Sequence, residues 1–186
     1  MEDSKIMTRG KTHTLSIALA GITAALYTVL TIFAASLNLA SGVIQVRFSE
    51  ALTILPFFGF AGVPGVTLGC LISNIIIGSN IFDIVFGTLA TFIGAIGTWY
   101  IGVLFRKNGN KSFKFLSPVP PIMANTIIVP LILTYAYGVP DGIPFLMLTV
   151  GAGEVISCGV LGLLLLSVLY PIKNIIFNQN THQNLL

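Results

Sequence analysis

The stretch from Val43 to Gly62, VIQVRFSEALTILPFFGFAG, places an arginine and a glutamate at the start of a long apolar run. Arg47 and Glu50 stand three positions apart in a chain whose residues are 55% hydrophobic and only 8% charged. A soluble domain carries about a quarter charged residues, so a fold in water would have too little polar surface. Apolar runs near or above 18 residues recur along the chain, and they predict an all-α integral membrane protein.

Six apolar segments are predicted to be transmembrane helices. They cover approximately residues 14–37, 49–60, 64–77, 81–105, 119–137 and 143–172. The second and third are short for a bilayer about 30 Å thick, and the intervening GFAGVPG is also compatible with one re-entrant hairpin. The resulting organisation is an N-terminal tail (1–13), a six-helix transmembrane domain (14–172) and a C-terminal tail (173–186).

The basic residues predict the orientation of these helices. With six spans, eight of the nine lysines and arginines fall on the side of both termini, and Arg47 alone falls opposite. Because cytoplasmic loops are enriched in lysine and arginine, we expect both termini in the cytoplasm. An odd number of spans would separate Lys173 from the basic segment 106–114. The first apolar run is too long for a signal peptide and lacks a cleavage site, so we expect it to be retained.

Polar residues within or beside the spans indicate a functional site, because ionisable groups are costly in hydrocarbon. The predicted topology gathers them near the outer face: Arg47, Glu50, Asp83 and Glu154, with Asn74 inside the third span, Asn125 inside the fifth, and Tyr135 and Tyr137 at the outer end of the fifth. Carboxylates pair with a ligand amine or accept two N–H bonds from a guanine-like edge. Asparagine both donates and accepts, and a tyrosine ring can stack on a flat ligand. This set is typical of a site for a small polar ligand that is cationic or carries an amidine.

Structural roles are an alternative for several of these residues. Arg47 and Glu50 can pair with each other within one helix. Asp83 suits the first turn of a helix, and the two asparagines can join neighbouring helices. Tyr135 suits the membrane interface. Glu154 is the hardest to explain in this way, because it lies inside a span and follows two glycines, where another helix or a ligand can approach the backbone. Asp141 lies in an external loop, where we expect it to be hydrated.

The first helix carries small residues at every fourth position. These are Ser16, Ala20, Ala24 and Thr28, with Gly21 on the adjoining edge. Such a stripe lets helices approach each other closely in lipid. The pattern is compatible with packing inside the protein and with docking of a membrane partner.

The sequence shows no catalytic or energy-coupling motif. RGKT at residues 9–12 resembles the end of a phosphate-binding loop, but Lys5 stands where the earlier glycine is required and no strand precedes it. Cys70 and Cys158 lie in apolar segments and are interpreted as packing residues rather than metal ligands. We therefore expect a binder or carrier with no cofactor or metal of its own and no nucleic-acid partner, and not an enzyme.

Four blocks of the sequence carry a family resemblance. QVRFSEALTILPFFGFAGVPGVTLGCLISN, FDIVFGTLATFIGA, PVPPIMANTIIV and GVPDGIPFLMLTVGAGEVISC, in this order, resemble the QueT family. Its members are substrate-binding S-components of energy-coupling factor (ECF) transporters for queuosine precursors. The resemblance extends over residues 14–162, and R-x-S-E followed by A-L-T-x-L-P is its most specific motif.

The resemblance implies an S-component-like six-helix bundle in a bacterial plasma membrane. It would capture 7-aminomethyl-7-deazaguanine or a close relative outside, and pass it inward with the transmembrane coupling subunit EcfT and two partner ATPases that use ATP. The stripe on the first helix would bind EcfT. The substrate-binding set would comprise the following residues: Arg47, Ser49, Glu50, Asn74, Asp83, Asn125, Tyr135 and Glu154. Glu154 would meet either the guanine-like edge or the aminomethyl cation, and Glu50 or Asp83 the other.

Two alternatives stay open at this point. Pockets diverge on a shared fold, so the chain could be an S-component for a different vitamin or nucleobase. It could also be a structural membrane protein that transports nothing, in which the buried charges only pair with one another. An intramembrane enzyme is a less favoured hypothesis.

Overall fold

The computed structural model describes residues 2–38, 46–110 and 112–177, with side chains from residue 13 onward. Within these ranges the chain forms helices and no strands, which confirms the all-α prediction. The elements are α1 (Glu2–Ser36), η1 (Phe48–Phe57), α2 (Gly62–Ile76), η2 (Asp83–Gly87), α3 (Thr88–Asn108), α4 (Ser112–Leu116), α5 (Val119–Tyr135), α6 (Ile143–Glu154), η3 (Val155–Leu161), α7 (Gly162–Leu169) and α8 (Lys173–Ile176).

Four helical stretches in the described part of the chain are long and apolar enough to cross a membrane. They are His13–Ser36, Asp83–Asn108, Ser112–Tyr135 and Ile143–Leu169. The other two apolar helices are shorter. η1 is a 3₁₀-helix, whose ten residues rise about 20 Å, and the 15 residues of α2 rise about 22 Å. Both fall short of the hydrocarbon thickness of about 30 Å. Each of the six predicted segments contains a helix in the structure. Whether η1 and α2 each cross the membrane stays a prediction.

The first helix begins earlier than its apolar pattern indicates. α1 starts at Glu2, whereas the apolar run starts near Thr14. Residues 2–13 contain no proline, so the hydrogen-bonded helix can continue into the polar N-terminal segment. The segment after residue 172 likewise opens with the short helix α8.

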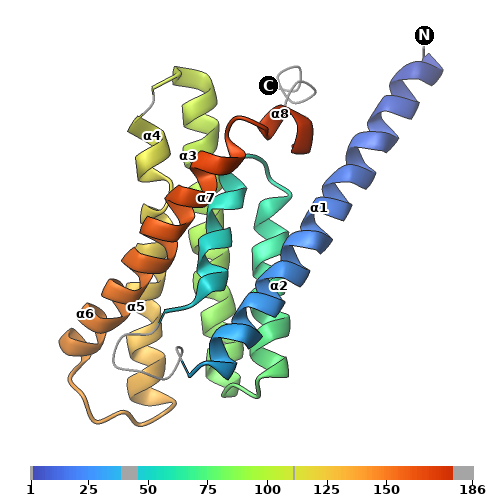
Figure 1. Cartoon of the computed structure of the whole chain (residues 1–186). Helices are drawn as coiled ribbons and strands as arrows, with labels where there is room; N and C mark the ends of the chain where they lie inside the picture. Colours follow the sequence, from blue (N-terminus) through green and yellow to red (C-terminus); the bar gives the residue numbers. More distant parts are fainter. Residues whose placement is uncertain (1, 39–45, 111, 178–186) are drawn as a thin grey trace.

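The helices run side by side as one bundle (Figure 1). At its lower end in the picture lie the end of α1, the turn between α2 and α3, and the loop between α5 and α6. At its upper end lie the start of α1, the turn between η1 and α2, the α3–α4 connection and α8. The names "lower end" and "upper end" are kept for these two regions.

Close backbone contacts hold η1 and α2 inside the bundle. α1 packs on α2 where Gly69 faces Tyr27, since a Cβ on this glycine would come within 2.6 Å of the tyrosine Cβ. α3 meets η1 at Gly102, where a Cβ would come within 2.2 Å of the Phe57 carbonyl oxygen. Arg106 Nη1 donates to the same oxygen over 2.8 Å, which caps the upper end of η1. These contacts fix η1, and with it the residues of its first turn.

Candidate functional site

Glu50 is buried in the first turn of η1, with 2% of its surface exposed. The Tyr27 hydroxyl of α1 donates to Glu50 Oε1, and Asn125 Nδ2 of α5 donates to Oε2 over 3.5 Å. The Thr53 hydroxyl donates to the Glu50 carbonyl oxygen over 2.6 Å. This side-chain bond competes with the helical backbone pattern, which suits a 3₁₀ turn. Three helices therefore hold the Glu50 carboxylate in one position.

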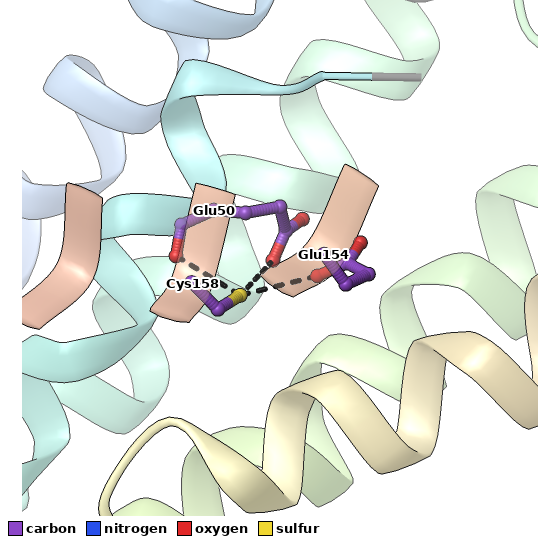
Figure 2. A group of neighbouring side chains, drawn as sticks. All are labelled: Glu50, Glu154 and Cys158. Carbon is purple, nitrogen blue, oxygen red and sulfur yellow. Dashed lines mark hydrogen bonds between the residues drawn. The ribbon is translucent and has the colours of Figure 1, made fainter. Parts of the chain in front are cut away.

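Glu154 lies close to Glu50 and comes from a different helix. It is the last residue of α6 and is also buried, and the π-helical segment η3 begins immediately after it. One turn further along, Cys158 donates from Sγ to Glu154 Oε2 over 3.1 Å. The same Sγ lies 4.0 Å from Glu50 Oε2 and 3.5 Å from the Glu50 carbonyl oxygen (Figure 2). We call Glu50, Glu154 and Cys158 the carboxylate cluster, in which one carboxylate oxygen of each glutamate and the Cys158 sulfur lie within 4.8 Å of one another.

The carboxylate cluster has the chemistry of a cation site. Two ionised carboxylates at this separation in a buried position repel each other, and a cation bound beside them, added to the charge of Arg47, favours the charged form of both. A ligand ammonium supplies that charge and donates hydrogen bonds to both groups. Two carboxylates and a thiolate are also ligands that a divalent metal ion such as Zn²⁺ accepts, although binding it requires loss of the thiol proton.

A second group of polar side chains surrounds Asp83 at the start of η2. The Tyr137 hydroxyl donates to Asp83 Oδ2 over 3.3 Å, and accepts a bond from the Asn80 backbone N–H over 3.1 Å. Asn74 Nδ2 lies 3.5 Å from the Asp83 carbonyl oxygen. We call Asn74, Asp83 and Tyr137 the Asp83 cluster. Like Glu154, Asp83 stands at the beginning of a π-helical segment, and such segments are frequent at functional sites.

Arg47 and Ser49 lie at the start of η1. Arg47 is half-buried and interacts electrostatically with both Asp83 and Glu50. Its backbone N–H donates to the Ser157 hydroxyl of η3 over 3.2 Å. An Arg47–Glu50 pair does not by itself account for the glutamate, whose oxygens accept from Tyr27 and Asn125. The Ser49 hydroxyl is fully buried and has no hydrogen-bond partner among the described residues.

Tyr135 lies apart from both clusters. Its side chain is 79% exposed and lines an apolar groove of about 340 Å³ together with Phe82, Phe86, Ile128, Leu131, Ile132 and Ala136. Tyr137, two residues further along, is the tyrosine that reaches a buried carboxylate. A contact between Tyr135 and a substrate stays a prediction.

The small-residue stripe of α1 divides between two environments. Ala24 and Thr28 are buried, and the Thr28 hydroxyl lies 3.3 Å from the Gly69 carbonyl oxygen of α2. Ser16 and Ala20 are half-buried. Gly21 is exposed, and a Cβ there would meet no neighbouring atom within 4 Å. Internal packing thus accounts for Ala24 and Thr28, and the binding of a partner by the stripe stays a prediction.

Two members of the site were not singled out from the sequence. Tyr27 lies in the middle of a predicted span. A buried hydroxyl there needs a hydrogen-bond partner, and this requirement is the signal in the sequence that points to Tyr27. Cys158 was interpreted as a packing residue. It stands four positions after Glu154, and residues at that spacing share a helix face. Its bond to Glu154 adds it to the site.

Comparisons with known proteins agree with the family resemblance. The family model described as QueT transporter matches residues 17–171. The protein named "Queuosine precursor transporter QueT" of Lactococcus lactis subsp. cremoris (strain MG1363) is 36% identical over 83 residues, which are 45% of this chain and 48% of that relative. The aligned region therefore spans about half the length of the curated relative. No solved structure matches.

Proposed function

This chain belongs to the QueT transporter family and is a multi-pass membrane protein, and from that premise we propose that it is the substrate-binding component of an importer for a queuosine precursor. The substrate is 7-aminomethyl-7-deazaguanine or a close relative. The importer is an ECF-type ABC transporter, in which this chain is the S-component. It performs no chemistry on the substrate.

The carboxylate cluster is the observation that carries this proposal. A queuosine precursor of this type joins a primary ammonium group to a guanine-like edge with several N–H donors. Glu50 and Glu154 offer acceptors for both parts, and the ammonium adds positive charge to that of Arg47 beside two buried carboxylates. A neutral purine would satisfy the hydrogen bonds without adding this charge.

The hydrogen bonds around the cluster support a division of roles. Tyr27 and Asn125 fix Glu50 from two helices, so its carboxylate is already oriented before a ligand arrives. Preorganised groups lose less entropy on binding. Glu154, held through Cys158, meets the second part of the ligand from α6. Arg47 interacts electrostatically with Glu50, and Ser49, next to Glu50 in η1, offers a free hydroxyl.

Transport requires partners in this proposal. The coupling subunit EcfT docks on α1, and two ATPases bind and hydrolyse ATP, so this chain carries no nucleotide itself. η1 and α2 complete six crossings, with both termini in the cytoplasm. In support, Arg106 and Lys107 lie in the last turn of α3, which leads into the α3–α4 connection of the upper end, and Lys173 begins α8 there, whereas Asp83 and Asp141 follow α2 and α5 at the lower end.

Reconstitution tests the proposal directly. Vesicles that contain the full chain, EcfT and both ATPases, with ATP on the ATPase side, should accumulate radiolabelled 7-aminomethyl-7-deazaguanine. Vesicles with this chain alone should bind the ligand without accumulating it. A panel of unlabelled vitamins and nucleobases as competitors then separates the alternatives. Displacement by a vitamin, and not by the deazaguanine, would assign the chain to a different substrate.

The docking role of α1 has its own test at Gly21. Because this glycine is exposed and has open space around it, Gly21→Leu should leave internal packing unchanged. We expect normal ligand binding with loss of EcfT association and of uptake. Normal uptake in Gly21→Leu vesicles would remove this face of α1 from the coupling interface.

A further inference from the structure

Two lysines share one tyrosine ring at the upper end of the bundle. Lys114 Nζ of α4 lies 3.1 Å from the centroid of the Tyr170 ring, and Lys173 Nζ of α8 lies 4.1 Å from the same centroid. Each contact is a cation–π interaction, and the ring follows directly after α7. The helices α4 and α8 thus place two ammonium groups around one ring.

No described carboxylate belongs to this region to balance the two charges. The acidic side chains in residues 13–38, 46–110 and 112–177 are Glu50, Asp83, Asp141 and Glu154, and they lie in η1, η2, the α5–α6 loop and α6. Burial raises the pKa of Tyr170, but hydrogen bonds and charges from Lys173 and Lys114 outweigh it, so that pKa lies below its ordinary value. The surroundings of the ring are therefore electropositive.

An apolar pocket adjoins the paired lysines. It has a volume of about 220 Å³ and is lined by Lys114, Phe115, Leu163, Leu166, Ser167, Tyr170 and Pro171. Phe115 is also largely exposed, as are the apolar side chains of Leu164, Val168 and Ile175 in α7 and α8. A ligand that used all of these features would have an anionic head and an apolar tail.

We propose that Lys114, Tyr170 and Lys173 form a binding site for the phosphate headgroup of an anionic phospholipid. The two ammonium groups bind the phosphate oxygens, and an acyl chain lies in the pocket against Leu163 and Phe115. Basic pockets between helices at a membrane surface bind anionic lipid in this way. A free phosphate would match the charge but would leave the apolar wall unused, so the structure favours the lipid. The site is independent of the proposed substrate.

Native mass spectrometry of the full chain in detergent can test this site. The probes are phosphatidylglycerol, phosphatidylcholine with the same acyl chains, and inorganic phosphate. We expect wild type to retain phosphatidylglycerol in preference to the other two. The double variant Lys114→Gln/Lys173→Gln should bind phosphatidylglycerol roughly 10- to 30-fold more weakly. Lys107→Gln is the matched control, because Lys107 is an exposed lysine of the same end and lies outside the pocket.

Three results would overturn the proposal. The first is an unchanged preference for phosphatidylglycerol in the double variant. The second is an equal loss in Lys107→Gln, which would mean that general positive charge suffices. The third is retention of inorganic phosphate as strong as that of phosphatidylglycerol. If the double variant does not fold, Lys173→Gln alone gives the same test at roughly a fivefold loss, and no loss in that variant contradicts the site.

Discussion

The carboxylate cluster and the Asp83 cluster both bury acidic groups in an apolar bundle, yet they differ in how the charge is satisfied. Asp83 is the single carboxylate of its cluster and accepts a bond from Tyr137, whose hydroxyl is in turn fixed by the Asn80 backbone. In the carboxylate cluster, Glu50 and Glu154 face each other across Cys158 (Figure 2). The Asp83 cluster holds one carboxylate, whereas the carboxylate cluster holds two, whose charged forms a bound cation would stabilise further beside Arg47.

We expect this difference to separate a structural role for Asp83 from a binding role for Glu50 and Glu154. A buried acid that the fold satisfies contributes to stability when its partners are kept. A pair of buried acids in contact costs stability until something neutralises it, and proteins retain such pairs where a ligand or ion binds. The two clusters should therefore respond in opposite ways to neutral substitutions.

The largest effect is expected for Glu154→Gln. Removing one carboxylate that a bound ammonium requires should weaken binding of 7-aminomethyl-7-deazaguanine by about 2–5 kcal/mol. The unfolding temperature should not fall, because the substitution also removes the repulsion with Glu50. Calorimetry and thermal unfolding of the purified chain measure the two quantities.

Asp141→Asn is the control for this substitution, since Asp141 is an exposed acid of the lower end. Asp141→Asn should change neither the ligand affinity nor the unfolding temperature. Normal ligand affinity together with a lowered unfolding temperature in Glu154→Gln would show that Glu50 and Glu154 form a structural pair rather than a binding site.

A smaller effect, on stability rather than on ligand binding, is expected for Tyr137→Phe. Loss of the hydroxyl removes its hydrogen bond to Asp83, which should lower the free energy of unfolding by about 1 kcal/mol. Ligand affinity should stay within the error of the measurement. A loss of affinity comparable to that of Glu154→Gln would show that the Asp83 cluster also contacts the substrate.

Thiol labelling sharpens the comparison further. Cys158 lies in the carboxylate cluster, whereas Cys70 is a buried thiol that accepts a bond from Thr91. Bound 7-aminomethyl-7-deazaguanine should slow the reaction of Cys158 with N-ethylmaleimide several-fold and leave that of Cys70 nearly unchanged. Mass spectrometry of the peptides gives both rates. Equal protection of both thiols would indicate general stiffening of the bundle rather than occupation of the cluster.

The smallest effect is expected for Tyr135→Ala. This side chain is largely exposed in an apolar groove and lies apart from both clusters. Affinity and unfolding temperature should be close to those of wild type. A clear loss of affinity would restore the stacking role that the sequence indicates.

The helices were predictable because long apolar runs leave few alternatives in a membrane protein. The cost of burying charged or polar groups likewise indicates Glu50, Glu154 and Asn125 from the sequence. These three residues come from separate helices and meet in the structure. The 3₁₀ geometry of η1 was not predictable, since it depends on Thr53 and on close contacts with α3.

The pairing within the site could not be derived from residue spacing. Which carboxylate faces which depends on the rotation of each helix, and the π-helical turns after Glu154 and at Asp83 change that rotation locally. For the same reason the pattern did not distinguish Tyr135 from Tyr137. Only the folded chain shows that Tyr137 reaches Asp83.

The most direct test compares 7-aminomethyl-7-deazaguanine with 7-deazaguanine, which differs only by lacking the aminomethyl group. If Glu50 and Glu154 bind the cation, calorimetry of the wild-type chain should give much tighter binding of the aminomethyl compound, and Glu154→Gln should remove most of that difference. Equal affinity of the two compounds for the wild-type chain would contradict the claim that the carboxylate cluster recognises a positively charged substrate.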